Sequence, residues 1–318
     1  MKKFDKKYRD IITTESLFRA WEKFLCGKRK RSDVLLFQSR LADNIFKLQK
    51  DLRNKTYCHG GYEEFKIADP KPRIIHKASV RDRLLHHLIH HELYPYFDKK
   101  FIFHSYSCRN NKGTHKAIYY FKSMTDTIKS KTLWVLKCDI RKFFASIDHK
   151  ILKRILEKYI KDEDLLKLIG NIIDSFSLGL PLGNLTSQLL VNIYMNEFDQ
   201  FVKHKLKEKY YIRYADDFVF ISEDKLRLKN LIPKISKFLE QKLKLKLHPN
   251  KVFIKTIYSG IDFLGWVHFQ KHRVLRTSTK RKMVRNLKGE PKEETKSSYK
   301  GLLSHGNTYK LKHKINLF

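Results

Sequence analysis

Apolar residues recur along this chain with two different periods, and the segments they define alternate between helices and strands. Leu41, Ile45, Leu48 and Leu52 follow one another at helical spacing, which predicts an amphipathic helix near the N-terminus. Asp148 stands where a helix N-cap is expected, ahead of another apolar run with helical spacing. The predicted helices are 41–52, about 80–97, the segment that begins after Asp148, about 186–206 and the segment around 235–243.

Short apolar or alternating runs, bounded by turn residues, predict the strands. A hairpin is expected over residues 65–75, with its turn at Asp69-Pro70-Lys71-Pro72. Two further strands are expected at 252–257 and 263–269, and from Thr277 the chain becomes strongly basic with a helical pattern. The chain is therefore predicted to be a mixed α/β (α+β) protein.

Two acidic segments follow apolar strands. Tyr214-Ala215-Asp216-Asp217 lies between Ile212 and the apolar run Phe218-Val219-Phe220, which predicts a tight hairpin with adjacent acids at its tip. For so short a motif, a solvated Asp-rich turn is the alternative. The run Leu133–Asp139 predicts a second strand that ends in a carboxylate. Since Mg²⁺ prefers carboxylate oxygens and keeps positions open for phosphate, two such strand ends predict a nucleotidyl-transfer site.

The composition indicates the kind of partner that this chain binds. Among 318 residues, 42% are hydrophobic, so the chain is folded and long enough for two or three subdomains. Its 68 Lys and Arg against 33 Asp and Glu give a formal charge of +35, which indicates a polyanionic partner, with nucleic acid favoured over a membrane surface. The four cysteines lack paired spacing, so neither a zinc ribbon nor a disulfide framework is expected.

No membrane segment is expected. The longest stretch without charges lies between Asp174 and Glu197, and it contains the helix breakers Gly179 and Pro181. The N-terminus carries charges throughout and has no apolar core, so no signal peptide is expected. The simplest location for such a chain is the cytoplasm.

Taken together and in this order, the motifs resemble those of a reverse transcriptase. The segments that carry the resemblance are DPKPRIIHKASVRDR (69–83), DIRKFF (139–144), GLPLGNLTSQLLVN (179–192), YADD (214–217) and FLGW (263–266). The resemblance covers about residues 60–310 and implies a right-hand polymerase with fingers, palm and a short helical thumb. The implied parts are an N-terminal helical extension (1–58), fingers (59–130), a palm (131–275) with a helical insertion (149–180), and a thumb (276–318).

For the catalytic acids, the resemblance implies a two-metal mechanism. Asp139 and Asp216 would bridge two Mg²⁺ ions, with Asp217 as a weaker or accessory ligand, and the backbone carbonyl of Ile140 would complete one coordination sphere. Such ions lower the pKa of the primer 3′-hydroxyl and neutralise the leaving pyrophosphate. Lys251 stands where a lysine of this family protonates the pyrophosphate; a solvated lysine is the alternative.

Other motif residues are implied to surround the dNTP substrate. These nucleotide-binding candidates are Lys71, Arg73, Phe144, Leu182, Gly183 and Gln188. Lys71 and Arg73 would clamp the triphosphate, although solvated charge is the alternative for both. Phe144 stands at the steric gate, where a flat ring beneath the sugar would exclude a 2′-hydroxyl; core packing is its alternative, and Phe143 is expected to face inward.

The remaining candidates contact nucleic acid. Phe263, Leu264, Gly265 and Trp266 resemble the primer grip. Tyr106 and Arg109 resemble a block near the template, where a tyrosine could stack on a base or be buried in the core. The histidine pairs within 86–91 raise the question of zinc, but without a third ligand at suitable spacing we expect a helix surface that touches nucleic acid or a partner.

Two residues indicate the type of reverse transcriptase. Most members place Gln before the glycine of the 182–188 motif and Pro after its serine, whereas this chain has Leu182 and Gln188. Both departures are similar to the enzymes of diversity-generating retroelements. Those enzymes copy a template RNA into cDNA, with frequent errors at adenines, for mutagenic retrohoming.

This resemblance implies as partners a template RNA, an RNA/DNA hybrid and a small, basic, oligomeric accessory protein. A group II intron-like or defence-associated reverse transcriptase is the alternative. A catalytically silent RNA-binding scaffold is a third alternative. Clustered acids argue against it, because negative charges do not help a surface to bind phosphates.

An apolar Leu182 side chain cannot hydrogen-bond a nucleotide, and the loss of one such contact relaxes nucleotide selection by roughly 1–3 kcal/mol. Core packing beside Pro181 is the other role open to Leu182.

Overall fold

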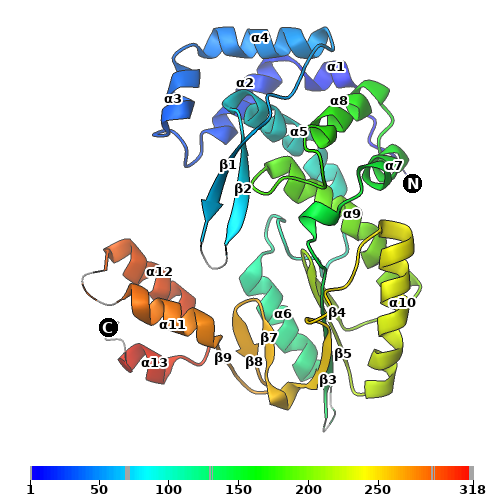
Figure 1. The fold of residues 1–318 in the computed structure, drawn as a ribbon, viewed down its shortest axis with the longest axis vertical. Coiled ribbons are helices and arrows are strands. Elements are labelled where there is room, and N and C mark those ends of the chain that lie inside the picture. The colour runs from blue at the N-terminus through cyan, green and yellow to red at the C-terminus, as the bar shows by residue number, and fades with distance from the viewer. Residues whose placement is uncertain are drawn as a thin grey trace. The chain divides into compact units, whose positions relative to one another are not determined.

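The computed structural model describes residues 2–68, 72–128, 130, 132–287, 289 and 291–314 (Figure 1). Contacts within the chain divide it into two compact units. The first unit comprises Met1–Ile102, Ile140–Leu206 and Phe238–Lys246, and the second comprises Phe103–Asp139, Lys207–Lys237 and Leu247–Phe318.

The first unit is mainly helical. Its helices are α1 (Tyr8–Ile11), α2 (Thr14–Phe24), α3 (Ser32–Gln38), α4 (Leu41–Arg53), α5 (Val80–Asp98), α7 (His149–Tyr159), α8 (Glu163–Asp174) and α9 (Leu185–His204). The strands β1 (Tyr62–Ile67) and β2 (Arg73–Ala78) form an antiparallel hairpin, and Phe144–Ser146 form a 3₁₀ turn. Helix α5 packs against α2 and α9 and forms the centre of this unit (Figure 1).

Helix boundaries in this unit follow side-chain caps. The Asp148 carboxylate accepts a hydrogen bond from the Ile151 amide (2.9 Å), so α7 begins where its N-cap was predicted. Asp162 caps α8 in the same way through the Leu165 amide (2.9 Å). In α4 the apolar face predicted from spacing is buried at Ile45, Leu48 and Leu52.

The second unit contains two antiparallel sheets. The larger sheet has the strand order β4 (Tyr211–Tyr214), β5 (Asp217–Ser222), β3 (Trp134–Asp139), β6 (Phe253–Thr256). The smaller sheet consists of β7 (Ile261–Phe263), β8 (Trp266–His268) and β9 (Arg273–Leu275). The helices are α6 (Thr114–Thr127), α11 (Thr277–Asn286), α12 (Glu293–Leu303) and α13 (Tyr309–Lys314); α10 (Lys225–Leu243) extends across the division between the units.

One face of the larger sheet forms the core of this unit. Val135 from β3 and Val219 and Ile221 from β5 pack in one cluster with Phe121 and Met124 of α6. The residues between them, Leu136, Phe218 and Phe220, are buried on the other face of the sheet. Because side chains alternate between the two faces, the face of Val135 and Val219 also contains Asp139 and Asp217 at the strand ends. A second cluster joins Trp266 of the small sheet to the basic C-terminal helices through buried apolar residues.

The predicted elements are confirmed in type and approximate position, with one difference. The strand expected over 263–269 is interrupted, because Phe263 ends β7 and Trp266 begins β8. Leu264 and Gly265 form the turn, both with positive φ (51° and 85°). The turn predicted at 69–72 falls mostly outside the described residues, and the division into extension, fingers, palm and thumb stays a prediction. None of the helices that the structure describes has the length and apolar character needed to cross a bilayer.

Candidate active site

The predicted catalytic acids lie at one end of the larger sheet. Asp139, the last residue of β3, is directly opposite Asp217, the first residue of β5. Directly opposed residues in an antiparallel pair have Cα atoms about 4.5–5.5 Å apart. Tyr214 pairs with Asp217, so the hairpin turn consists of Ala215 and Asp216. Ala215 has a φ of 56°, a left-handed conformation that a residue with a Cβ adopts only when its surroundings enforce it.

Two lysines hold the carboxylates of this strand end. Lys251 Nζ lies 2.9 Å from Asp139 Oδ1 and 3.1 Å from Oδ2. Lys137 Nζ lies 3.1 Å from Asp217 Oδ2, while Asp217 Oδ1 is buried without a hydrogen-bond partner. The structure therefore brings Lys251, one of the candidate site residues, to the acids, and it adds Lys137, which the sequence reasoning missed. The sequence did contain a signal for Lys137, because it lies two residues before Asp139 on the same predicted strand and so shares a face with that acid.

Burial and neighbouring charges both act on the pKa of Asp217. Burial raises the pKa of its carboxyl to about 7; Asp139 and Asp216 add to this effect and Lys137 opposes it. Asp139 and Asp216 therefore act electrostatically on Asp217, and perturbed carboxyl groups of this kind cluster at functional sites.

The donor chemistry of this strand end fits Mg²⁺. Carboxylate oxygens are the ligands that this ion prefers, and Asp217 Oδ1 is a buried acceptor without a partner. Within the described ranges, no group of three or more His, Cys, Asp or Glu side chains is already arranged to hold a metal ion. In the present arrangement Lys251 Nζ lies within hydrogen-bond distance of both oxygens of Asp139.

Arg213 fixes the turn that carries Asp216. This fully buried side chain donates through Nη1 to the Ala215 carbonyl (3.1 Å) and through Nη2 to Ser105 Oγ (3.0 Å). Backbone hydrogen bonds join the same segments, since the Arg213 amide donates to the His104 carbonyl and the Tyr106 amide donates to the Arg213 carbonyl (both 3.0 Å). Sequence reasoning did not select Arg213, although a cation inside an apolar strand beside the acids was a signal.

The predicted template block is mostly structural in this arrangement. Tyr106 is 3% exposed and packs in the core of the second unit, where burial raises its pKa to about 12. A buried ring has no face available for a base, which favours the core alternative over stacking. Arg109 is half-buried and donates through Nη1 to the Ser105 carbonyl (3.0 Å).

Replacing Arg213 by Lys is expected to destabilise the protein by about 2–4 kcal/mol, because a buried ammonium cannot reproduce both guanidinium hydrogen bonds. Urea unfolding of the purified variant measures the change. Arg227→Lys is the matched control: Arg227 also makes two hydrogen bonds, both to Glu208, but its side chain is about half exposed, so the cost should stay below about 1 kcal/mol. Equal losses in the two variants would contradict a special role for Arg213.

In the first unit, the loop before α9 holds the segment of the predicted steric gate. The Phe144 carbonyl accepts a hydrogen bond from the Leu180 amide (2.9 Å). Gly179 has a φ of 68°, and a Cβ added to it would overlap the Phe144 carbonyl oxygen and Ala145. Phe143 is buried as expected and meets the half-buried Phe144 ring edge-on, with the ring centroids 5.6 Å apart.

The same loop continues to the β1–β2 hairpin. The His76 amide of β2 donates to the Leu182 carbonyl (2.9 Å), and Asn184 Nδ2 donates to the His76 carbonyl (3.0 Å). Gly183 has a φ of 108°, and a Cβ there would lie 2.7 Å from Ile75 Cγ2. Leu182 is half-exposed, in contrast to the buried Pro181 before it, so it is not a simple core residue.

Among the other predicted nucleotide residues, Arg73 is exposed at the start of β2 and Gln188 is half-buried in α9. The structure therefore brings Leu182 and Gly183 to the hairpin that carries Arg73, all within the first unit. Lys71 lies outside the described residues.

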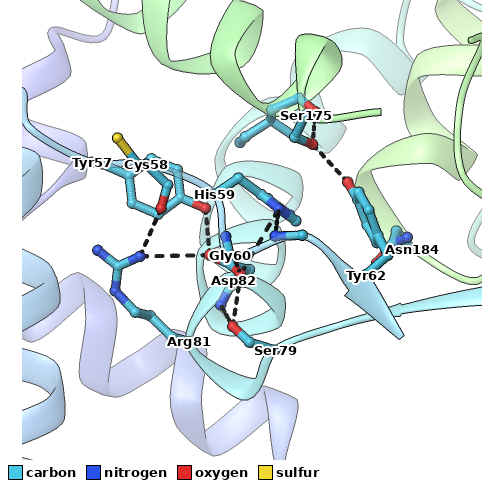
Figure 2. A network of polar contacts seen from close by, with 12 residues as sticks. Tyr57, Cys58, His59, Gly60, Tyr62, Ser79, Arg81, Asp82, Ser175 and Asn184 are labelled. Atoms are coloured by element: carbon cyan, nitrogen blue, oxygen red, sulfur yellow. Dashed lines mark hydrogen bonds and ion pairs between the residues drawn. The ribbon is translucent and has the colours of Figure 1, made fainter. Parts of the chain in front are cut away.

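A polar network fastens this hairpin to α5 (Figure 2). The buried Asp82 carboxylate accepts hydrogen bonds from Tyr57 Oη (2.7 Å), the Gly60 amide (3.0 Å) and Ser79 Oγ (2.7 Å). Tyr62, at the start of β1, hydrogen-bonds through its hydroxyl to Ser175 Oγ (2.8 Å). The base of the hairpin is thus held on two sides, while Arg73 lies at the far end of β2.

Not all four histidines of α5 lie on the surface of the helix, as the sequence had suggested. The prediction is wrong for His86, which is buried and stacks on His59 with ring centroids 5.4 Å apart. Burial lowers the pKa of His86 to about 3, so it is neutral at physiological pH. His87 and His90 are half-buried, with only His91 exposed among these four histidines.

The predicted primer-grip residues form the β7–β8 turn. Phe263 and Trp266 pair across the two strands and are buried, whereas Leu264 and Gly265 are half-exposed in the turn. The Gly265 carbonyl accepts a hydrogen bond from the Arg276 amide (3.1 Å), immediately before α11. The aromatic residues hold the turn, and its tip is the part that can meet a ligand.

Several known proteins are similar to this chain. Residues 66–268 match the model of the family described as reverse transcriptase (RNA-dependent DNA polymerase). Protein YkfC of Escherichia coli (strain K12) is 25% identical over an alignment of 307 residues that covers 82% of this chain and 79% of YkfC. The group II intron-encoded protein LtrA of Lactococcus lactis subsp. cremoris is 24% identical over 223 residues, which cover 65% of this chain and 36% of LtrA.

Among solved structures, apo telomerase from Candida Tropicalis, truncated from the C-terminal domain, matches with a TM-score of 0.51. The identity is 14%, and the match covers 68% of this chain and 55% of that chain, so the likeness concerns the fold alone. It agrees with the predicted right-hand polymerase class. With the family model matching well over half of its length, this chain belongs to the reverse transcriptase family of RNA-dependent DNA polymerases.

Proposed function

We propose that this chain transfers nucleotides from dNTPs to a primer on an RNA template, using Asp139 and Asp216 to hold two Mg²⁺ ions. Reverse transcriptases in general use Mg²⁺ and dNTPs and bind template RNA. The observation that carries the proposal is the pairing of Asp139 with Asp217, beside the turn that presents Asp216. When bound, the ions would acidify the primer 3′-hydroxyl and neutralise the charge of the leaving pyrophosphate.

The protein's own groups have separate roles in this proposal. Arg213 orients the turn through the Ala215 carbonyl, and Asp217 is the accessory acid. Lys251 Nζ, which contacts Asp139, would give a proton to the leaving pyrophosphate once it is released from that carboxylate. The backbone carbonyl of Ile140, directly after Asp139, would complete one coordination sphere.

Substrate selection is assigned to the loop and hairpin of the first unit. Arg73 is exposed and suits bidentate contact with the triphosphate, together with Lys71. The half-buried Phe144 ring would lie beneath the sugar and exclude a 2′-hydroxyl. Leu182, Gly183 and Gln188 would line the base and sugar, with the Gly183 backbone free of side-chain bulk.

The primer, the template and their hybrid would be bound by the second unit. We assign the β7–β8 turn to the primer strand and Arg109 to the template region, and α11–α13 to the RNA/DNA hybrid. The charge of +35 supports strong, salt-dependent binding of nucleic acid.

Within the family, we propose the diversity-generating type, which copies its template with errors at adenines and works with a small basic accessory protein. Leu182 and Gln188 support this assignment. A group II intron-like enzyme is the second candidate, because similar proteins include group II intron-encoded LtrA. The cytoplasm is the proposed location.

Extension of a DNA primer on a defined RNA, with and without a candidate accessory protein, tests the proposal. We expect Mg²⁺-dependent cDNA that EDTA abolishes. A folded preparation that gives no cDNA with any primer and partner would identify a silent RNA-binding scaffold instead.

Replacing Leu182 by Gln is expected to reduce misincorporation opposite template adenine by about tenfold, since a restored hydrogen bond is worth roughly 1–3 kcal/mol. Sequencing of the cDNA measures the error rate at each template base. Leu178→Gln is the matched control, because Leu178 lies four residues earlier in the same loop and is 68% exposed. An unchanged adenine error rate in Leu182→Gln would refute the role of Leu182 in fidelity.

A further inference from the structure

We propose that His149 is a positioning residue for nucleotide selection, which fixes the Gly179 carbonyl and thereby holds the segment of the proposed steric gate in place. The inference rests on the proposed function and names a residue through which the same site would discriminate against ribonucleotides. Sequence reasoning did not select His149, which is the first residue of α7 and lies in the first unit together with Phe144.

The His149 ring lies between the two ends of the segment that follows α8. Its Nε2 is 2.6 Å from the Gly179 carbonyl oxygen, and its Nδ1 is 3.4 Å from Oδ1 of Asp174, the last residue of α8. A carbonyl oxygen only accepts hydrogen bonds, so Nε2 is the donor. Asp174 also pairs with Lys153, one turn further along α7. The start of α7 therefore contacts both ends of residues 174–179.

The start of α7 is itself fixed, which allows His149 to act as an anchor. The Asp148 carboxylate accepts a hydrogen bond from the Ile151 amide (2.9 Å) and another from Lys244 Nζ (2.6 Å), just after α10. The His149 side chain is 19% exposed, so water has limited access to its hydrogen bond with Gly179.

The peptide group between Gly179 and Leu180 transmits this hold to the gate. Its oxygen accepts from His149 Nε2, and its N–H donates to the Phe144 carbonyl (2.9 Å). Because a peptide group is planar, a rotation that breaks one of these bonds also misaligns the other. The backbones are in close contact here, since a Cβ on Gly179 would lie 2.1 Å from the Phe144 carbonyl oxygen. Loss of the His149 bond should therefore loosen the backbone that carries the Phe144 ring.

Two substitutions separate the bond to Gly179 from the rest of the side chain. The amide nitrogen of Gln lies near the position of His Nε2 and can donate to the Gly179 carbonyl, whereas that of Asn lies near Nδ1 and cannot reach it. We expect His149→Asn to raise rNTP incorporation relative to dNTP about fivefold, the effect of one hydrogen bond, and His149→Gln to stay within about twofold of the wild type. The ratio of kcat/KM for the two nucleotides, from primer extension on RNA by the full-length chain, measures selection.

His204→Asn is the matched control. His204 also makes one side-chain hydrogen bond, to Gln200, but it is exposed near the end of α9, so nucleotide selection should not change. Thermal unfolding of all variants measures stability. A lower unfolding midpoint with unchanged nucleotide selection in His149→Asn would make His149 a purely structural residue and overturn the inference.

Hydrogen exchange tests the positioning separately from the chemistry. Mass spectrometry of overlapping peptides should show about fivefold faster exchange of the Leu180 amide in His149→Asn, but not in His149→Gln. Equal exchange in the two variants would contradict the hold on Gly179. Failure of the proposed function has another signature: Phe144→Val would then leave rNTP selection unchanged, or the wild type would give no cDNA, even where exchange of the Leu180 amide responds as expected.

Discussion

Asp216→Asn is expected to abolish cDNA synthesis while the protein remains folded. The amide keeps the shape of the side chain in the two-residue turn but removes the charge that would hold a cation between β4 and β5. Metal stabilisation of the transition state is worth several kcal/mol, so activity should fall by at least about three orders of magnitude. Extension of a labelled primer on RNA measures activity, and circular dichroism with thermal unfolding checks the fold.

Glu223→Gln provides the matched control for this change. It also replaces one acid by its amide just after β5, at the opposite end of the strand from the turn, and Glu223 is exposed. Extension by this variant should stay within about twofold of the wild type, as expected for an exposed charge far from the chemistry. Wild-type cDNA yield from folded Asp216→Asn would refute the catalytic assignment.

Among substitutions that add one methyl group in the loop before α9, Gly179→Ala is expected to have the largest effect on stability and activity. The new Cβ would overlap the Phe144 carbonyl oxygen and the Ala145 backbone, and the φ of 68° adds strain for a residue with a side chain. Strain and overpacking together should cost roughly 2–4 kcal/mol of unfolding free energy. Because the displaced segment carries the proposed steric gate, primer extension should fall and rNTP incorporation relative to dNTP should rise.

Gly27→Ala isolates the steric part of this effect. Gly27 has a φ of 67°, nearly the same as Gly179, but a Cβ added to it meets nothing within 4 Å. Its cost should therefore be confined to about 1–2 kcal/mol of backbone strain, with dNTP selection unchanged. Equal changes in unfolding free energy and in nucleotide selection in the two variants would contradict the steric explanation, in which a side chain at position 179 displaces Phe144.

Local patterns were sufficient to predict most of the fold. The hairpin that carries Asp216 follows from two apolar runs around a short polar turn, and the α7 cap follows from Asp148 ahead of a helical period. Both depend on residues that are close in the chain. The one interrupted strand has its turn at Leu264 and Gly265, within the motif that resembles the primer-grip turn, and the strand predicted over 263–269 did not allow for this turn.

Contacts across long stretches of chain were not predictable in the same way. Arg213 and Ser105 are 108 positions apart, and no periodic pattern relates them. Lys137 finds its partner only once β3 and β5 pair in register. His86 was assigned to a surface because paired histidines suggested one, but α5 is covered by neighbouring helices on several sides, so its polar positions are also buried.

The bridge between Ser105 and Arg213 also affects how this protein associates with others. Strand β4 is an outermost strand of the larger sheet, and such strands usually offer unpaired amides and carbonyls to any extended peptide. Here the amide and carbonyl of Arg213 are already bonded to His104 and Tyr106. The border next to the acidic turn therefore offers no unpaired backbone group at Arg213 to an extended peptide from another molecule.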